Sequence, residues 1–256
     1  MEIAGLPLLG FALSLVAGWL AGGAGNWTAD VLPRRGAEDA PAPPAGHGFA
    51  LWHYLTLPWY FFPRPGPGGS LRRRGGCPHC GQLRPWRAPL LELATIAAFL
   101  LAWWRFGGEA AKVLVLWAFA SYLLVVLVID LEHRRVLNVM LIPAAAVALL
   151  ASFLPGPPNW KQALVGGAAG LGIFFLIALV SRGKMGAGDV KLAGVIGLMV
   201  GFPVVLTALF IGVLLGGAAA IIMLITRRAG RKSYIAYAPY LCLGALACLY
   251  QIVPPG

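Results

Sequence analysis

The sequence predicts an all-α, polytopic integral membrane protein, a helical bundle of about eight transmembrane helices with one irregular loop outside the membrane. Hydrophobic residues make up 59% of the 256 residues and charged residues only 11%, a balance that water-soluble domains do not keep. Apolar runs long enough to cross roughly 30 Å of hydrocarbon as helices recur along the chain. Basic residues cluster between alternate runs, as expected for loops on one side of a membrane.

The expected spans are residues 5–23, 89–106, 111–130, 137–154, 162–181, 189–201, 203–226 and 235–253. The sixth span is short, and Gly201 and Pro203 interrupt the stretch before the seventh, so a broken hairpin is an alternative there. These spans divide the chain into a first transmembrane helix (1–23), a cytosolic loop domain (24–88) and a transmembrane core of about seven helices (89–256).

The distribution of positive charge orients the bundle. The loops at residues 24–88, 131–136, 182–191 and 227–234 hold 8, 2, 3 and 4 Lys or Arg residues, against three on the opposite side. Because basic residues concentrate in cytoplasmic loops, these four loops are expected to face the cytosol. The net charge of +11 is then a topology signal, and no nucleic-acid partner is expected. Glu2, with no Lys or Arg before the first run, favours an outside N-terminus over a signal peptide.

Acidic residues at membrane depth need a reason, because each costs on the order of 2.5–3.5 kcal/mol on insertion scales. The chain has nine acidic residues, of which Glu92, Asp130 and Asp189 lie in or at the expected spans. Asp130 closes the third span and Asp189 opens the sixth, so both are expected at the cytosolic membrane edge. Two close carboxyl groups that share one proton can activate water for hydrolysis at neutral pH.

Two other interpretations fit the same aspartates. In the first, both aspartates are helix-end charges: Asp130 pairs with Arg134 or Arg135, and Asp189 is the N-cap of its helix. In the other, they form a proton relay in a transporter.

The local sequence around Asp189 points to a family. Residues 186–192 read Gly-Ala-Gly-Asp-Val-Lys-Leu, a GxGDxKL pattern, and Ile129-Asp130-Leu131-Glu132-His133 supplies an aspartate at the end of an earlier span. The chain thereby resembles the prepilin leader peptidases of type IV pilus and type II secretion systems. The GxGD core alone is shared with presenilin-like and signal-peptide-peptidase-like proteases.

The resemblance to prepilin leader peptidases extends over most of the chain. It includes Gly25-Asn26 through Leu32-Pro33, Pro89 to Thr95, Pro143, and Ala238-Pro239-Tyr240-Leu241. The chain departs from the family at Leu137, where the family has proline, and retains the polar Asn138 that follows. The geometry of the turn after Asp130 is therefore where a difference is expected.

The resemblance implies that Asp130 and Asp189 are the catalytic aspartates of an inner-membrane (cytoplasmic-membrane) endopeptidase. Such an enzyme cuts a short basic leader from the cytosolic end of a prepilin or pseudopilin, and this proteolysis requires no cofactor. Gly186, Gly188 and Lys191 belong to the active-site loop, and we expect the glycines to leave room for the substrate strand. Glu92 and Asn138 are candidate supporting residues. Glu92 has the alternative reading of a helix-start charge.

The cysteines bear on a metal site. Cys77 and Cys80 form a CxxC pair in the cytosolic loop, which supplies half of a tetrahedral zinc site. Many family members carry a second CxxC, which this chain lacks, while Cys242 and Cys248 lie in the last span. Zinc binding and reduced thiols without metal both stay open.

A second activity and two other functional classes also stay open. Many family members methylate the new N-terminus with S-adenosylmethionine, although the sequence has no glycine-rich βα fingerprint for that cofactor. The alternatives to a prepilin peptidase are a presenilin-like GxGD intramembrane protease and a non-enzymatic transporter or assembly scaffold with structural aspartates.

Overall fold

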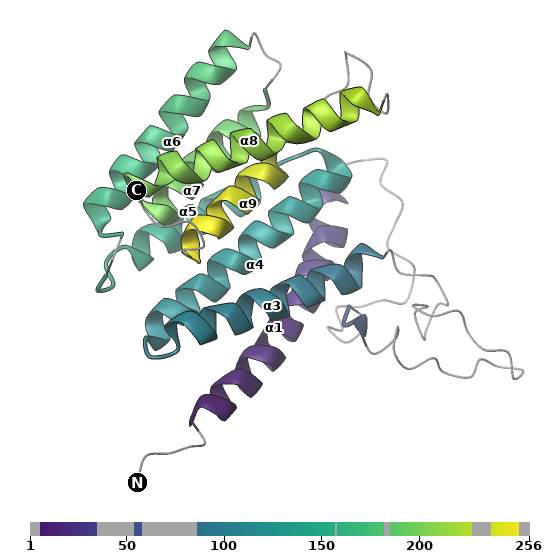
Figure 1. Cartoon of the computed structure of the whole chain (residues 1–256), viewed down its shortest axis with the longest axis vertical. Helices are drawn as coiled ribbons and strands as arrows, with labels where there is room; N and C mark the ends of the chain where they lie inside the picture. Colours follow the sequence, from purple (N-terminus) through teal and green to yellow (C-terminus); the bar gives the residue numbers. More distant parts are fainter. Residues whose placement is uncertain are drawn as a thin grey trace, which may run out of the picture. The chain divides into compact units, whose positions relative to one another are not determined.

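A computed structural model of the protein describes residues 6–34, 54–57, 86–156, 158–181, 185–226 and 237–250. Within these ranges the chain forms α-helices and one 3₁₀ helix, without β-strands (Figure 1). In chain order the elements are α1 (Leu6–Val31), η1 (Leu32–Arg34), α3 (Arg87–Phe106), α4 (Ala110–His133), α5 (Asn138–Ala151), α6 (Trp160–Val180), α7 (Ala187–Val200), α8 (Val204–Ile225) and α9 (Ala238–Leu249). The chain divides into two compact units, residues 1–125 and 126–256.

The lengths of the helices confirm an all-helical membrane protein. Five helices, α1, α3, α4, α6 and α8, are long and apolar enough to cross a bilayer, and α5 and α9 are shorter apolar helices. At 1.5 Å per residue, the 14 residues of α7 extend roughly 21 Å, less than the hydrocarbon thickness. Eight full spans therefore stay a prediction, whereas the multi-pass helical class is established.

The first unit is built on the packing of α1 against α3 (Figure 1). A Cβ atom on Gly18 would lie 2.7 Å from the Cα of Ile96, so only glycine allows the two backbones to approach this closely. α1 also continues past the predicted span to Val31. Gly25 and Asn26, which were expected in the loop, therefore lie inside a helix, because the small residues near position 23 serve close packing instead of ending the helix.

Glu92 of α3 is at the centre of a hydrogen-bond cluster in this unit. It is fully buried, and its two carboxylate oxygens accept five hydrogen bonds. Oε1 accepts from Asn26 Nδ2 (3.3 Å), from the Thr56 hydroxyl (2.6 Å) and from the Thr56 backbone N–H. Oε2 accepts from Trp19 Nε1 (2.9 Å) and from the Leu57 backbone N–H (3.0 Å). Glu92 therefore fastens residues 56 and 57 to α1 and α3.

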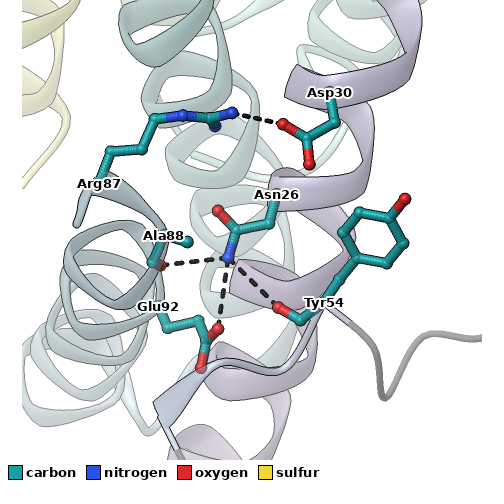
Figure 2. Close-up of polar contacts among 6 residues, drawn as sticks. All are labelled: Asn26, Asp30, Tyr54, Arg87, Ala88 and Glu92. Carbon is teal, nitrogen blue, oxygen red and sulfur yellow. Dashed lines mark hydrogen bonds and ion pairs between the residues drawn. The ribbon is translucent and has the colours of Figure 1, made fainter. Parts of the chain in front are cut away.

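Asn26 extends this polar cluster along α1 (Figure 2). Its Nδ2 also donates to the carbonyl oxygens of Ala88 (3.1 Å) and Tyr54 (3.3 Å). Beyond it, Asp30 and Arg87 form an ion pair between the same two helices. The cluster thus joins α1, α3 and the short described segment 54–57 in one network of buried polar contacts.

The second unit is organised around α7, which packs against α5, α6, α8 and α9. Nine of its 14 residues are buried. The closest approach is to α6, where a Cβ on Gly197 would come within 2.1 Å of the Gly166 carbonyl oxygen. Backbone contact between glycines replaces side-chain packing there. The position of α7, and of the aspartate in its first turn, is consequently fixed by α6.

The Glu92 cluster generates a prediction about stability. Replacing Glu92 by alanine leaves several buried donors without an acceptor, each costing about 1–3 kcal/mol. We expect Glu92→Ala to lower the free energy of unfolding by at least about 3 kcal/mol. Glu109→Ala is the matched control, since that side chain is 61% exposed and its ion pair with Lys112 lies at the surface. Thermal unfolding of the purified protein in detergent measures both variants, and equal losses would contradict the anchoring role.

Candidate active site

The second unit brings the two candidate aspartates together. Asp130 lies in the last turn of α4 and Asp189 in the first turn of α7. Asp130 is 4% exposed and Asp189 is half-buried. The two carboxyl groups are close enough to act on each other electrostatically, and both act on the buried Cys242 thiol of α9. The end of α4 and the start of α7 therefore converge beside α9, although 59 positions separate the aspartates in the sequence.

A backbone N–H group is directed at each carboxyl group. The N–H of Ala238, the first residue of α9, donates a hydrogen bond to Asp130, and the N–H of Gly186 donates one to Asp189. The first N–H groups of a helix have no partner within it, so α9 can direct one at Asp130. Pro239 suits the second position of α9 because its fixed φ matches the first helical turn. Both aspartates are thereby held at helix termini.

One oxygen of Asp130 is not satisfied. Its Oδ2 is buried and accepts no hydrogen bond from any residue in the described ranges. The large majority of buried polar atoms in proteins have a partner, and an acceptor buried without one costs about 1–3 kcal/mol. A buried carboxyl oxygen left open next to a second carboxyl group is typical of a reactive site. It is the position where a water molecule or a shared proton would be held.

The structure contradicts the helix-end interpretation of Asp189 and agrees in part with that of Asp130. The N-cap of α7 is Gly186, and Asp189 lies within the first turn, so the interpretation of Asp189 as an N-cap residue is wrong. Arg134 lies beyond the end of α4 and attracts the Asp130 carboxylate electrostatically. That attraction agrees with the helix-end pairing expected for Asp130, but it leaves Oδ2 unsatisfied.

The residues that flank Asp189 contact the turn that follows Asp130. Lys191 Nζ donates a hydrogen bond to Asn138 Oδ1 at 3.0 Å, which joins two of the predicted site residues. A Cβ on Gly188 would lie 2.9 Å from the Cβ of Val136. Val136 therefore takes the space in which a side chain at position 188 would begin. Close approach of a substrate strand to the backbone of these glycines stays a prediction.

Two residues near the carboxyl groups were not predicted. The buried Cys242 thiol lies within electrostatic reach of both aspartates. The Tyr237 side chain is within electrostatic reach of Asp189, and its ring contacts those of Phe174 and Tyr240. Pro239 is the sequence signal that could have indicated them, since it marks the start of the last helix.

The remaining sequence-predicted candidates are Glu92, Cys77 and Cys80. Glu92 belongs to the first unit, where it lies in the second turn of α3 and anchors residues 56 and 57, so its reading as a helix-start charge is wrong. Cys77 and Cys80 lie outside the described residues. Within the described ranges no group of three or more His, Cys, Asp or Glu side chains could hold a metal ion.

Comparison with known proteins identifies the family. Residues 117–221 match the model of the type IV leader peptidase family, a stretch that includes both aspartates. A prepilin leader peptidase/N-methyltransferase of Bacillus subtilis is 35% identical over 187 residues, covering 70% of this chain and 73% of the relative. Proteins of the same name are 28% identical in Pseudomonas aeruginosa (88% of this chain, 80% of the relative) and 26% identical in Stutzerimonas stutzeri (96% and 92%).

No solved structure matches the chain. The match to the family model and the extent of the similarity to the Bacillus subtilis protein are nevertheless sufficient: the chain belongs to the type IV leader peptidase family.

Proposed function

We propose that the chain is a membrane aspartyl endopeptidase in which Asp130 and Asp189 are the catalytic pair. The observation that carries the proposal is the buried Asp130 carboxyl group, which keeps one oxygen open while lying within electrostatic reach of Asp189. A carboxyl group needed only for structure would be expected to have its acceptors filled, as those of Glu92 are.

The chemistry follows from the pair. Two adjacent carboxyl groups share one proton, because two close negative charges cannot both persist in a low-dielectric site. The ionised carboxylate removes a proton from a water molecule, and the water oxygen attacks the scissile carbonyl carbon. The protonated partner gives its proton to the carbonyl oxygen as negative charge develops there. When the tetrahedral intermediate collapses, the C–N bond breaks, one carboxyl group passes a proton to the departing amine, and the other takes a proton back from a hydroxyl of the intermediate. The pair again holds one shared proton.

The substrate in this proposal is a prepilin or pseudopilin, cut between its short basic leader and its hydrophobic helix. The names of the relatives support this assignment, and family membership places the reaction among leader peptidases. The orientation proposed for the chain is a cytosol-facing site in the cytoplasmic membrane. It is supported by the Lys and Arg residues in loops that follow or precede the two aspartates.

Asparagine variants test the catalytic pair. With a co-expressed prepilin whose leader stays in the cytosol, we expect Asp130→Asn and Asp189→Asn each to lower leader removal by about 10²–10⁴-fold, since each variant loses a proton-transfer group. Glu132→Gln is the control, because Glu132 lies at the same helix end and is exposed. Unimpaired processing by both asparagine variants would refute the proposal.

The mass of the product from this assay also separates the alternatives. A cut between the leader and the hydrophobic segment is the result expected for a prepilin peptidase. A cut inside the hydrophobic segment would indicate a presenilin-like intramembrane protease, and no cut at all would favour a transporter or scaffold.

N-methylation of the new amino terminus is proposed as a second activity, on the basis of the relatives' names. S-adenosylmethionine would supply the methyl group. The described residues are helical and offer no strand–turn–helix site of the glycine-rich kind, so no residue is assigned to hold this cofactor. We expect the cleaved pilin to gain one methyl group, seen by mass spectrometry, only when S-adenosylmethionine is supplied. An unmodified product in its presence would limit the chain to proteolysis.

Zinc binding by Cys77 and Cys80 is tested by metal analysis. Two thiolates are half of a tetrahedral ligand set, so a structural zinc ion needs two further ligands. We propose that this lone pair stays as reduced thiols, and expect equally low zinc contents for the purified wild-type protein and Cys77→Ser. Stoichiometric zinc in the wild type that is lost in Cys77→Ser would show a metal site instead.

A further inference from the structure

The turn between α4 and α5 is coupled closely to the aspartate that precedes it. α4 ends at His133, three residues after Asp130, and α5 begins at Asn138. The N–H of Arg134 donates a hydrogen bond to the Asp130 carbonyl oxygen at 2.9 Å. Arg134 itself has φ of 52°, in the left-handed region that non-glycine residues rarely adopt. A displacement of this turn would therefore be transmitted to the last turn of α4.

Val136, in the middle of this turn, rests against the backbone of α7. The position where a Gly188 side chain would begin lies 2.9 Å from the Val136 Cβ and 3.5 Å from its Cγ2 and its carbonyl oxygen. Real Cβ atoms essentially never approach closer than about 3 Å, so the fit depends on hydrogen at position 188. Gly188 immediately precedes Asp189, so this contact lies on the N-terminal side of the aspartate.

A second contact lies on the other side of Asp189. Lys191 Nζ donates a hydrogen bond of 3.0 Å to Asn138 Oδ1, at the first residue of α5. Both side chains are exposed, so this bond alone stabilises the fold little. The bond instead restricts orientation. Together with the Val136 contact, it fixes the first turn of α7 at two points against the turn that follows Asp130.

We propose that Val136, Asn138, Gly188 and Lys191, here called the turn clamp, set the separation and orientation of the Asp130 and Asp189 carboxyl groups. The inference rests on the proposed function, because it takes these two aspartates as the catalytic pair. The four residues are positioning residues and do not touch the reacting atoms. Misplacement of a catalytic group by about 1 Å costs on the order of 10²-fold in rate, so modest shifts of the turn have large effects.

Steric rescue tests the Val136–Gly188 contact. We expect Gly188→Ala to lower kcat for leader cleavage by about 10- to 100-fold with little change in KM, because it moves the aspartates apart without altering substrate contacts. Adding Val136→Gly should restore most of the rate, since it removes the clashing carbon. Adding Val136→Ala should not, since its Cβ remains. Gly172→Ala is the matched control, because a Cβ there meets nothing within 4 Å.

A double-mutant cycle tests the Lys191–Asn138 bond. We expect Lys191→Met and Asn138→Leu each to lower kcat about three- to tenfold, the double variant to be no worse than the poorer single one, and Asn138→Asp to retain activity. If Lys191 instead binds the substrate, Lys191→Met raises KM and Asn138→Leu has no effect. The effects of the two substitutions are then independent of each other. That outcome, or the absence of rescue by Val136→Gly, overturns the clamp.

A disulfide provides a readout that does not depend on activity. Cysteines at positions 136 and 188 would have Cβ atoms near the 3.5–4.5 Å range that disulfides require, after a small outward shift. In the full-length membrane protein we expect Val136→Cys with Gly188→Cys to link on mild oxidation, as mapped by peptide mass spectrometry. Absence of the link contradicts the clamp even if Asp130 and Asp189 prove catalytic. A link together with active asparagine variants would instead show that the proposed function is wrong while the packing stands.

Discussion

The backbone contact between α6 and α7 is the interaction on which the candidate site depends. Gly166 and Gly197 approach so closely that no side chain fits at either position. This contact holds a short helix, α7, in the centre of the second unit, where four other helices pack around it. Because α7 is rigidly held along its length, its first turn becomes a fixed platform. Asp189 lies on this turn, within electrostatic reach of Asp130 at the end of α4 and of Tyr237 just before α9.

The two units contain buried carboxyl groups in opposite states. In the first unit, Glu92 accepts five hydrogen bonds and holds a short segment of chain against α1 and α3. In the second, Asp130 receives one backbone hydrogen bond and keeps an oxygen without a partner. A fully satisfied buried carboxylate rigidifies a structure, whereas an unsatisfied one stores free energy that a bound water or substrate can release. The difference supports a structural role for Glu92 and the chemical role proposed for Asp130.

Much of the protein's class could be predicted from its sequence. Composition and apolar run length indicated a helical membrane protein, and the scarcity of acidic residues drew attention to Asp130, Asp189 and Glu92. Composition could not predict which residues contact one another in the fold. The proximity of the aspartates depends on how α4, α7 and α9 pack, and the role of Val136 depends on a turn that places an ordinary apolar residue against Gly188.

Two errors in the sequence-based prediction have physical causes. The first span was expected to end at residue 23, but glycines in α1 allow close packing against α3, and the helix continues to Val31. Glu92 could be read as a charge near a helix start because no pattern in the sequence indicated its hydrogen-bond donors. Some of these donors come from residues 56 and 57, in a stretch whose composition indicated irregular structure. Side-chain bonds to irregular segments leave no periodic signal in a sequence.

The pH dependence of kcat for leader cleavage by the wild-type protein tests the shared proton most directly. A pair that needs one ionised and one protonated carboxyl group is active only between two titrations, so a bell-shaped profile is predicted whose limbs belong to the pair. Replacing either aspartate by asparagine should lower activity strongly at every pH. A rate that rises with pH to a plateau and stays there would show that a single ionised group suffices, and would contradict the account of Asp130 and Asp189 as a proton-sharing pair.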